Sequence, residues 1–228
     1  MDGNGRWAKK KGAARIFGHR SAITAVRESA EFCAEKGIRF LTLYAFSTEN
    51  WNRPKDEVQG LMALLVSTIK DELPTLQKNN IRLASIGDVS LLPEKTQKSL
   101  QKAKEQTSAN TGLTLILALN YSGRWDVEQA VKKIGKSIEK GELSANLISE
   151  NLISTYMDTN GVPDPELLIR TSGEMRVSNF LLWQIAYTEL YFTDVLWPDF
   201  RKKHLEEACE AFQKRERRFG MTSEQVKI

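Results

Sequence analysis

The chain has 228 residues, of which 41% are hydrophobic, and its 33 Lys and Arg against 29 Asp and Glu give a formal net charge of +4. This length favours one sizeable domain spanning residues 1–228. The basic residues are spread along the chain, which argues against a general nucleic-acid-binding protein, because such proteins gather them into patches.

The two cysteines, Cys33 and Cys209, lie far apart and lack the spacing of metal ligands. They predict free thiols and a reduced compartment. No apolar run reaches the ~18 residues of a membrane span, and no signal peptide is recognisable. We therefore expect a cytoplasmic protein.

Four runs of consecutive apolar residues predict buried strands. In chain order they cover residues 38–46, 81–86, 113–119 and 167–169. Because none of these runs alternates polar and apolar residues, we expect both faces of the sheet to be covered.

Helical periodicity occupies the segments between these strands. Over residues 57–76 the apolar side chains fall on one stripe of a helix, and Pro54 suits its first turn. Further helices are predicted over residues 18–36, 93–108, 124–140 and 201–218. This alternation predicts an α/β fold with a mostly parallel central sheet flanked by helices.

Polar residues follow each predicted strand, in the segments 47–53, 87–88, 120–124 and 170–173. In open parallel sheets, ligands bind beyond the carboxyl ends of the strands. The sequence therefore predicts a ligand site where these segments meet.

The first residues, Asp2-Gly3-Asn4-Gly5-Arg6, have the composition of an anion-binding segment. Glycines let backbone N–H groups approach phosphate oxygens, and an arginine can bind the same oxygens. The Asp2 carboxylate suits a divalent cation that bridges to those phosphates. An ordinary polar turn would have the same composition, and neither nucleotide-binding motif fits, because the P-loop Gly-Lys-Ser/Thr is missing and no strand comes first.

Two arginines with interleaved hydroxyl groups follow the strand 167–169. This pattern is typical of a site that binds a second phosphate group, formed here by Arg170, Ser172, Arg176 and Ser178. The alternative is that the arginines form surface salt bridges. Glu189 follows a nearly apolar run and is open as a metal ligand, a partner for an arginine or a turn residue.

His19 and the C-terminal arginines can each be interpreted as functional or as structural residues. His19 lies near Arg15 and Arg20 and is either a phosphate donor or a structural histidine. The C-terminal Arg215, Arg217 and Arg218 suit a solvated helix end.

Four blocks resemble the signature motifs of the cis-prenyltransferase family. They are residues 1–7 (MDGNGRW), 46–54 (FSTENWNRP), 170–174 (RTSGE) and 179–200, and the resemblance extends over nearly the whole chain. It implies sequential condensation of isopentenyl diphosphate onto farnesyl diphosphate with new double bonds in cis. The match is close to the bacterial members that make undecaprenyl diphosphate, the lipid carrier precursor for cell-wall polymers.

The resemblance also implies which residues form the active site. Asp2 would be the essential acid and a Mg²⁺ ligand, Glu189 the second Mg²⁺ ligand, and Asn50 would act near the isopentenyl group. The allylic diphosphate would be held by Gly3, Asn4, Gly5, Arg6, Trp7, Arg15 and His19, in a region completed by Ser47, Thr48, Glu49, Trp51 and Arg53. The homoallylic diphosphate would be held by Arg170, Arg176, Val177 and Ser178. Arg218 and Gly220 resemble a C-terminal Arg-x-Gly motif that approaches a site across a homodimer.

The residue types suit this chemistry. The leaving diphosphate needs its charge neutralised by Mg²⁺, arginines and N–H groups. Two diphosphates must be held apart but aligned, which explains two separate arginine sites. Because a neutral amide is a poor base, we expect Asn50 to orient the substrate while a diphosphate oxygen or water takes the proton.

Three further expectations follow from the resemblance. The growing chain needs an apolar tunnel, with ordinary core packing as the alternative for its candidate lining residues Ile23, Val26, Ala45, Leu65 and Leu113. Product release implies peripheral contact with a membrane. The family's leading N-terminal strand has no counterpart in the sequence, because Met1 matches an internal methionine of the family. Either residues precede Met1, or the sheet lacks one strand and the segment around Asp2 is frayed.

Other functions are also open. A shorter-chain cis-prenyl diphosphate synthase would share all of these motifs. A non-catalytic partner subunit of the same fold would lack the acid and arginines, which are present here. A basic RNA-binding domain would cluster basic and aromatic residues, and the sequence does not.

Overall fold

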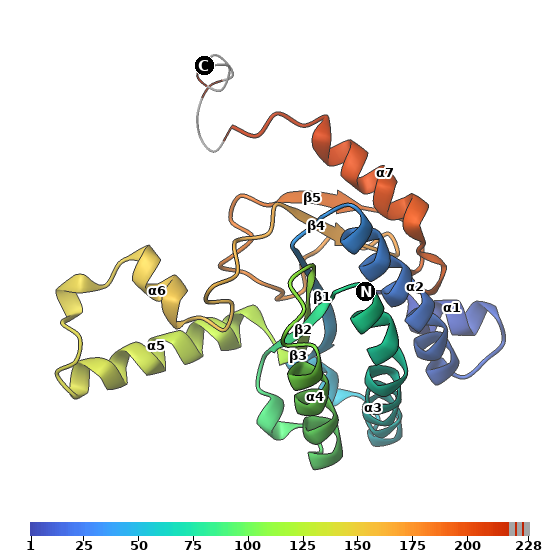
Figure 1. The fold of residues 1–228 in the computed structure, drawn as a ribbon, viewed down its shortest axis with the longest axis horizontal. Coiled ribbons are helices and arrows are strands. Elements are labelled where there is room, and N and C mark those ends of the chain that lie inside the picture. Colours follow the sequence, from blue (N-terminus) through green and yellow to red (C-terminus); the bar gives the residue numbers. More distant parts are fainter. Residues whose placement is uncertain (219–221, 223–224, 226–228) are drawn as a thin grey trace.

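The computed structural model describes residues 1–218, 222 and 225. Its strands are β1 (Phe40–Ser47), β2 (Arg82–Ile86), β3 (Thr114–Tyr121), β4 (Leu167–Arg170) and β5 (Glu189–Phe192). Its α-helices are α1 (Asn4–Lys10), α2 (Arg15–Glu35), α3 (Lys55–Lys78), α4 (Glu94–Gln106), α5 (Gly123–Glu139), α6 (Glu150–Tyr156) and α7 (Lys202–Gln213). Short 3₁₀ helices are η1 (Thr48–Asn52), η2 (Val89–Leu91), η3 (Ala145–Leu147) and η4 (Trp197–Asp199). Figure 1 shows helices around the strands, with α5 and α6 extending away from them.

The strand pairs of the described residues are all parallel, which confirms the predicted α/β class. They form two sheets rather than the single one predicted: a three-stranded sheet in the order β1-β3-β2, and the pair β4-β5. Within the described part of the chain, β1 and β4 are each hydrogen-bonded to a strand on one side. Each therefore presents an unpaired edge.

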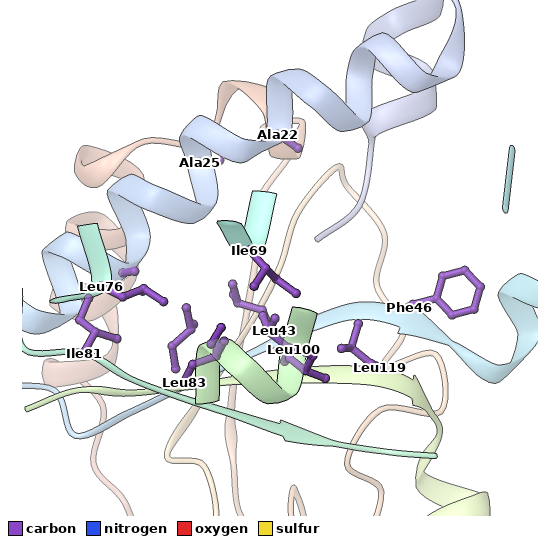
Figure 2. Close-up of a cluster of buried hydrophobic side chains, with 14 of the residues drawn as sticks. Ala22, Ala25, Leu43, Phe46, Ile69, Leu76, Ile81, Leu83, Leu100 and Leu119 are labelled. Carbon is purple, nitrogen blue, oxygen red and sulfur yellow. The ribbon is translucent and has the colours of Figure 1, made fainter. Parts of the chain in front are cut away.

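Both faces of the three-stranded sheet are covered, as the sequence predicted. On one face, side chains of the strands interleave with those of α2, α3 and α4 (Figure 2). This core includes Ala22, Ala25, Leu43, Ile69, Leu76, Leu83, Leu100 and Leu119. On the other face, Ile116, Ala118 and Tyr121 pack with Leu181 and the half-buried Phe180. Much of the second cover is irregular backbone, and Trp125 of α5 also packs against it.

Helix α1 lies directly against α2 because Gly18 permits it. A Cβ atom at Gly18 would lie 2.0 Å from the carbonyl oxygen of Asn4, so no larger residue fits there. This close approach brings the first turn of α1 against the first turns of α2.

Several element bounds differ from the predictions. The sequence predicts no helix in the first residues, but Gly3 adopts a φ of +102° and α1 begins at the next residue. Strand β5 was missed because it has four residues and begins with a charged side chain, so only its pairing with β4 reveals it. The last predicted helix ends at Gln213, before a run of charged residues. Among the described helices, none is long and apolar enough to cross a membrane.

Candidate active site

Asp2 is fixed at the carboxyl end of β4. Its backbone N–H donates to Thr171 Oγ1 at 2.9 Å, and the Thr171 hydroxyl donates back to the Asp2 carbonyl at 2.9 Å. The same carbonyl accepts from the N–H of Trp197 at 2.9 Å. The expected fraying of this segment is therefore not seen.

The carboxylate of Asp2 is bound by two donors. Its Oδ2 accepts from Arg170 Nη2 at 2.8 Å, and its Oδ1 accepts from the N–H of Gly3 at 2.7 Å. Burial raises the pKa of Asp2, but the hydrogen bonds from Arg170 and Gly3 outweigh burial and hold this pKa below its ordinary value. Asp2 is therefore an anion at neutral pH.

Arg170 connects Asp2 to the segment that follows β4. Its Nη1 donates to the carbonyl of Arg176 at 2.7 Å and to Ser178 Oγ at 2.8 Å. Glu174 pairs with Arg176 and, at 3.1 Å, with Arg6. We call Asp2, Arg6, Arg170, Glu174, Arg176 and Ser178 the β4 cluster, since they gather at the carboxyl end of that strand.

A second group of charged residues forms where α1, α2 and the start of α3 meet. Asn4 Nδ2 lies 3.3 Å from His19 Nδ1, and the Glu57 carboxylate accepts from both Arg15 and Arg53 at 3.1 Å. Burial lowers the pKa of His19 to about 4, with the charge of Arg53 as the next cause. We call Asn4, Arg15, His19, Arg53 and Glu57 the α2 cluster.

Side-chain hydrogen bonds hold the 3₁₀ helix η1 in place beside these clusters. The N–H of Ser47 donates to Asn50 Oδ1 at 3.1 Å, which occupies the amide oxygen. Trp51 Nε1 donates to Asn120 Oδ1 at 2.8 Å, and Asn179 Nδ2 donates to Glu49 Oε1 at 2.8 Å. Burial raises the pKa of Glu49, but hydrogen bonds, first that from Asn179, hold it below its ordinary value.

A cavity of about 1170 Å³ lies between the unpaired edges of β1 and β4. Eight predicted site residues line it: Asp2, Ser47, Glu49, Asn50, Arg53, Arg170, Val177 and Ser178. Consecutive residues of both strands, including 37–44 and 162–171, form its walls. The structure thus brings residues from distant parts of the chain to one site.

The predicted tunnel residues do not line this cavity. Val26, Leu65 and Leu113 belong to the core beneath α2 and α3, and Ala45 is exposed on β1. Ile23 is also absent from the cavity walls. A prenyl tunnel along these residues stays a prediction.

Three further predicted residues lie outside the two clusters. Glu189 begins β5 opposite Leu167, three register positions from Arg170, and accepts from Arg215 Nη1 at 2.8 Å. It is thus a partner for an arginine here, and its role as a metal ligand stays a prediction. Trp7 donates from its indole to Asp199 at 2.8 Å. Arg218 pairs with Glu216, and Gly220 lies outside the described residues.

Sequence reasoning missed several residues that hold the site together. They are Thr171, which holds Asp2, Glu174, which holds two arginines, and Asn120 and Asn179, which hold η1. Asn120 and Asn179 adopt φ values of 49° and 60°, a left-handed conformation that often marks functional sites. The available signal was their position just after predicted strands or within the matched motifs.

The residues present fit a Mg²⁺ ion in one way. Magnesium is usually bound through one or two carboxylates together with substrate phosphates and waters. Asp2 offers one partly exposed carboxylate, and no group of three or more His, Cys, Asp or Glu in the described ranges is placed to hold a metal. The buried Oδ1 of Asn4 has no partner among the described residues. Such a site fits the ion when a diphosphate supplies the other ligands.

Together, the parallel α/β fold and the two arginine clusters near the carboxyl ends of its strands are typical of an enzyme that handles phosphate groups. Residues 1–220 match the family described as "Putative undecaprenyl diphosphate synthase", and the chain belongs to this family of prenyl-transferring enzymes.

Similar proteins agree with this membership. The chain is 50% identical over 228 residues to an isoprenyl transferase of Porphyromonas gingivalis, covering 100% of this chain and 90% of the relative. It is 53% identical over 222 residues to the (2E,6E)-farnesyl-diphosphate-specific ditrans,polycis-undecaprenyl-diphosphate synthase of Photorhabdus laumondii, covering 97% and 87%. The crystal structure of lavandulyl diphosphate synthase from Lavandula x intermedia, in complex with dimethylallyl diphosphate, has a TM-score of 0.94 at 37% identity and covers 96% and 95%.

Proposed function

We propose that this enzyme condenses isopentenyl diphosphate sequentially onto farnesyl diphosphate to give undecaprenyl diphosphate. The presence of two separate arginine clusters at one site supports this reaction best, because a condensation of two diphosphates must hold both at once. Relatives of about 50% identity that are named for this product support the same choice.

The two clusters are proposed to take different substrates. The α2 cluster, with the first turn of α1, would hold the allylic diphosphate, whose leaving charge Arg15, Arg53 and the N–H groups neutralise. Arg170, Arg176 and Ser178 of the β4 cluster would hold isopentenyl diphosphate. Asp2 belongs to the β4 cluster, and Mg²⁺ bound to its carboxylate would supply further positive charge to a leaving diphosphate.

Asn50 is proposed to orient the isopentenyl group. Its amide oxygen accepts from the N–H of Ser47, and its NH₂ group would contact the substrate. Because a neutral amide is a poor base, Asn50 is not expected to remove the proton. A diphosphate oxygen or water would take the proton. Replacing Asn50 by Ala is expected to lower turnover more than affinity for farnesyl diphosphate.

The direct test is incubation of the enzyme with farnesyl diphosphate, labelled isopentenyl diphosphate and Mg²⁺, followed by sizing of the products. We expect a long-chain product of eleven isoprene units, the number that its name implies. A product that stops at fewer units would favour the shorter-chain synthase instead. A folded protein that extends nothing would favour the non-catalytic partner subunit.

The cavity between β1 and β4 is proposed to accept one more parallel strand. Its walls are two sheet edges whose backbone groups are unpaired, which suits a strand better than a hydrocarbon chain. Adding a β-strand sequence ahead of Met1 should therefore raise the melting temperature and the activity. A Gly/Ser extension of equal length is the control, and equal behaviour of both extensions would contradict the proposal.

The enzyme is proposed to act in the cytoplasm as a homodimer. Val131, Leu147, Ile148 and Leu182 are exposed apolar residues, and the first three lie on the projecting α5–α6 region or its connection (Figure 1). A dimer through this region should dissociate when Val131 is replaced by Glu, which light scattering can measure. An unchanged mass would contradict this interface.

A peripheral membrane contact is proposed at the end of α1. Lys9, Lys10, Lys11 and Lys203 are exposed there together with Phe17, a combination that suits anionic lipid surfaces. Sedimentation with anionic vesicles, but not with neutral ones, is the expected result. Charge reversal at Lys10 and Lys11 should abolish it.

A further inference from the structure

Glu57 lies in the first turn of α3 and joins two arginines that come from different elements. Its Oε2 accepts from Arg15 Nη1 at 3.1 Å, and its Oε1 accepts from Arg53 Nη1 at 3.1 Å. Arg15 begins α2, whereas Arg53 follows η1. One carboxylate therefore sets the spacing between two side chains that the backbone does not connect directly.

The exposed fractions of the three side chains indicate that the Glu57 carboxylate lies beneath the two arginines. The Glu57 side chain is 11% exposed, against 67% for Arg15 and 37% for Arg53. Each arginine uses Nη1 for its bond to Glu57, so Nε and Nη2 remain as donors for a ligand. Arg15 and Arg53 thus present several N–H groups to the solvent, while the Glu57 carboxylate beneath them fixes their geometry.

The surroundings of this pair belong to the proposed allylic site. The charges of Arg53, Glu57 and Arg15 all act on His19, which contacts Asn4 of α1. A carboxylate repels phosphates, so Glu57 is unsuited to bind the ligand itself. Its position suits a residue that acts through the arginines.

We propose that Glu57 is a positioning residue, which holds Arg15 and Arg53 at the separation needed for both to donate to one diphosphate. The identity of that diphosphate as the allylic substrate rests on the proposed function. Orienting the arginines before binding lowers the side-chain entropy that binding costs. The negative charge of Glu57 opposes anion binding only weakly, because two guanidinium groups neutralise it.

The test replaces Glu57 by Gln, which keeps the shape but can accept from only one of the two arginines. Calorimetry with inorganic pyrophosphate and Mg²⁺ should show about ten-fold weaker binding, the order expected for one freed arginine. The KM for farnesyl diphosphate should rise by a similar factor, while the KM for isopentenyl diphosphate should stay within about two-fold.

Glu72 provides a matched control on the same pair of helices. Its side chain is 10% exposed and pairs with Arg27 of α2, so Glu72→Gln also weakens an ion pair between α2 and α3. It lies about 22 Å further along α3, at 1.5 Å per residue. Glu72→Gln should lower the melting temperature but leave pyrophosphate affinity and both KM values unchanged.

A double-mutant cycle tests the route through the arginines. In an Arg15→Ala, Arg53→Ala background, Glu57→Gln should change pyrophosphate affinity by less than about two-fold. If Glu57→Gln weakened pyrophosphate binding about ten-fold in that background as well, the proposal would be overturned. Unchanged binding by Glu57→Gln alone would also overturn it. Tighter binding would do the same, because it would show that the carboxylate competes with the anion.

The proposed function fails separately from this inference. If the unmodified chain binds pyrophosphate but makes no prenyl product, the function is wrong and calorimetry still decides the role of Glu57. Absence of pyrophosphate binding by the unmodified chain would overturn both.

Discussion

The β4 and α2 clusters both hold arginines with carboxylates, but the acids differ in exposure. In the β4 cluster, Arg170 is 14% exposed and its partner Asp2 is 38% exposed. Around Glu57 of the α2 cluster the order is reversed, because Glu57 is 11% exposed while Arg15 and Arg53 are 67% and 37% exposed. An acid that reaches solvent can take part in ligand and metal binding, whereas a buried one can only support its partners. The two clusters should therefore respond differently to the loss of their acids.

The largest effect is expected from Asp2. Replacing Asp2 by Ala removes the proposed metal ligand and leaves the half-buried Arg170 without its carboxylate, so kcat should fall by about 10²- to 10³-fold. Rates of isopentenyl incorporation measure this. Glu174→Gln is the control within the same cluster, since it weakens the pairing of Arg6 and Arg176 but removes no metal ligand. Equal losses of kcat in both variants would show that Asp2 and Glu174 do not differ in their roles.

A smaller effect is expected when arginine is exchanged for lysine. Lys at position 170 cannot reproduce the three bonds from Arg170 to Asp2, Arg176 and Ser178, so the KM for isopentenyl diphosphate should rise by about 10- to 100-fold. Arg15→Lys should instead raise the KM for farnesyl diphosphate. Steady-state kinetics in both substrates separates the clusters, and a rise in the same KM for both variants would contradict their separate roles.

The pH dependence of stability should distinguish the clusters further. The folded pKa of His19, about 4, lies below the ordinary 6.5, so between pH 6.5 and 4 the unfolded chain binds a proton that the folded chain excludes. Stability should therefore fall as the pH drops through this window, and the His19 contribution between pH 7 and 5 is about 2 kcal/mol. Urea unfolding of His19→Gln at both pH values should show a correspondingly smaller loss. Parallel losses in the two proteins would contradict this.

The smallest effect is expected from η1, which borders both clusters. Trp51→Phe removes the bond to Asn120 while keeping the ring that packs against Phe46. The loss should cost about 1 kcal/mol, or roughly a five-fold rise in the KM for farnesyl diphosphate. Asn120→Ala also removes the bond from Asn120 Nδ2 to the Asp88 carbonyl, so its loss combined with Trp51→Phe should be smaller than the sum of the two single losses but not zero. Additive losses would show that the two residues act independently.

The elements predicted best are those whose burial follows from their local amino-acid composition. Strand β3 is a run of apolar residues, and α3 carries a clear apolar stripe, so both were found within a few residues. Strand β5 and helix α1 were missed because their short sequences contain charged residues or glycine, and their structure depends on β4 and α2. The division into two sheets was likewise not predictable, because it depends on which strand edges meet.

For the site, sequence alone determined the kinds of residue and their approximate place. Arginines, hydroxyls and Asp2 fall in motifs at strand ends, and the resemblance of these motifs to those of a known family made the prediction of diphosphate chemistry specific. Only the tertiary structure decided their partners, because Asp2 and Arg170 are separated by 168 residues and Arg15 and Glu57 by 42. Long-range pairing also decided that Glu189 binds Arg215 and that Glu57 supports two arginines, since hydrogen bonds are selected by distance and burial in the folded chain rather than by sequence position.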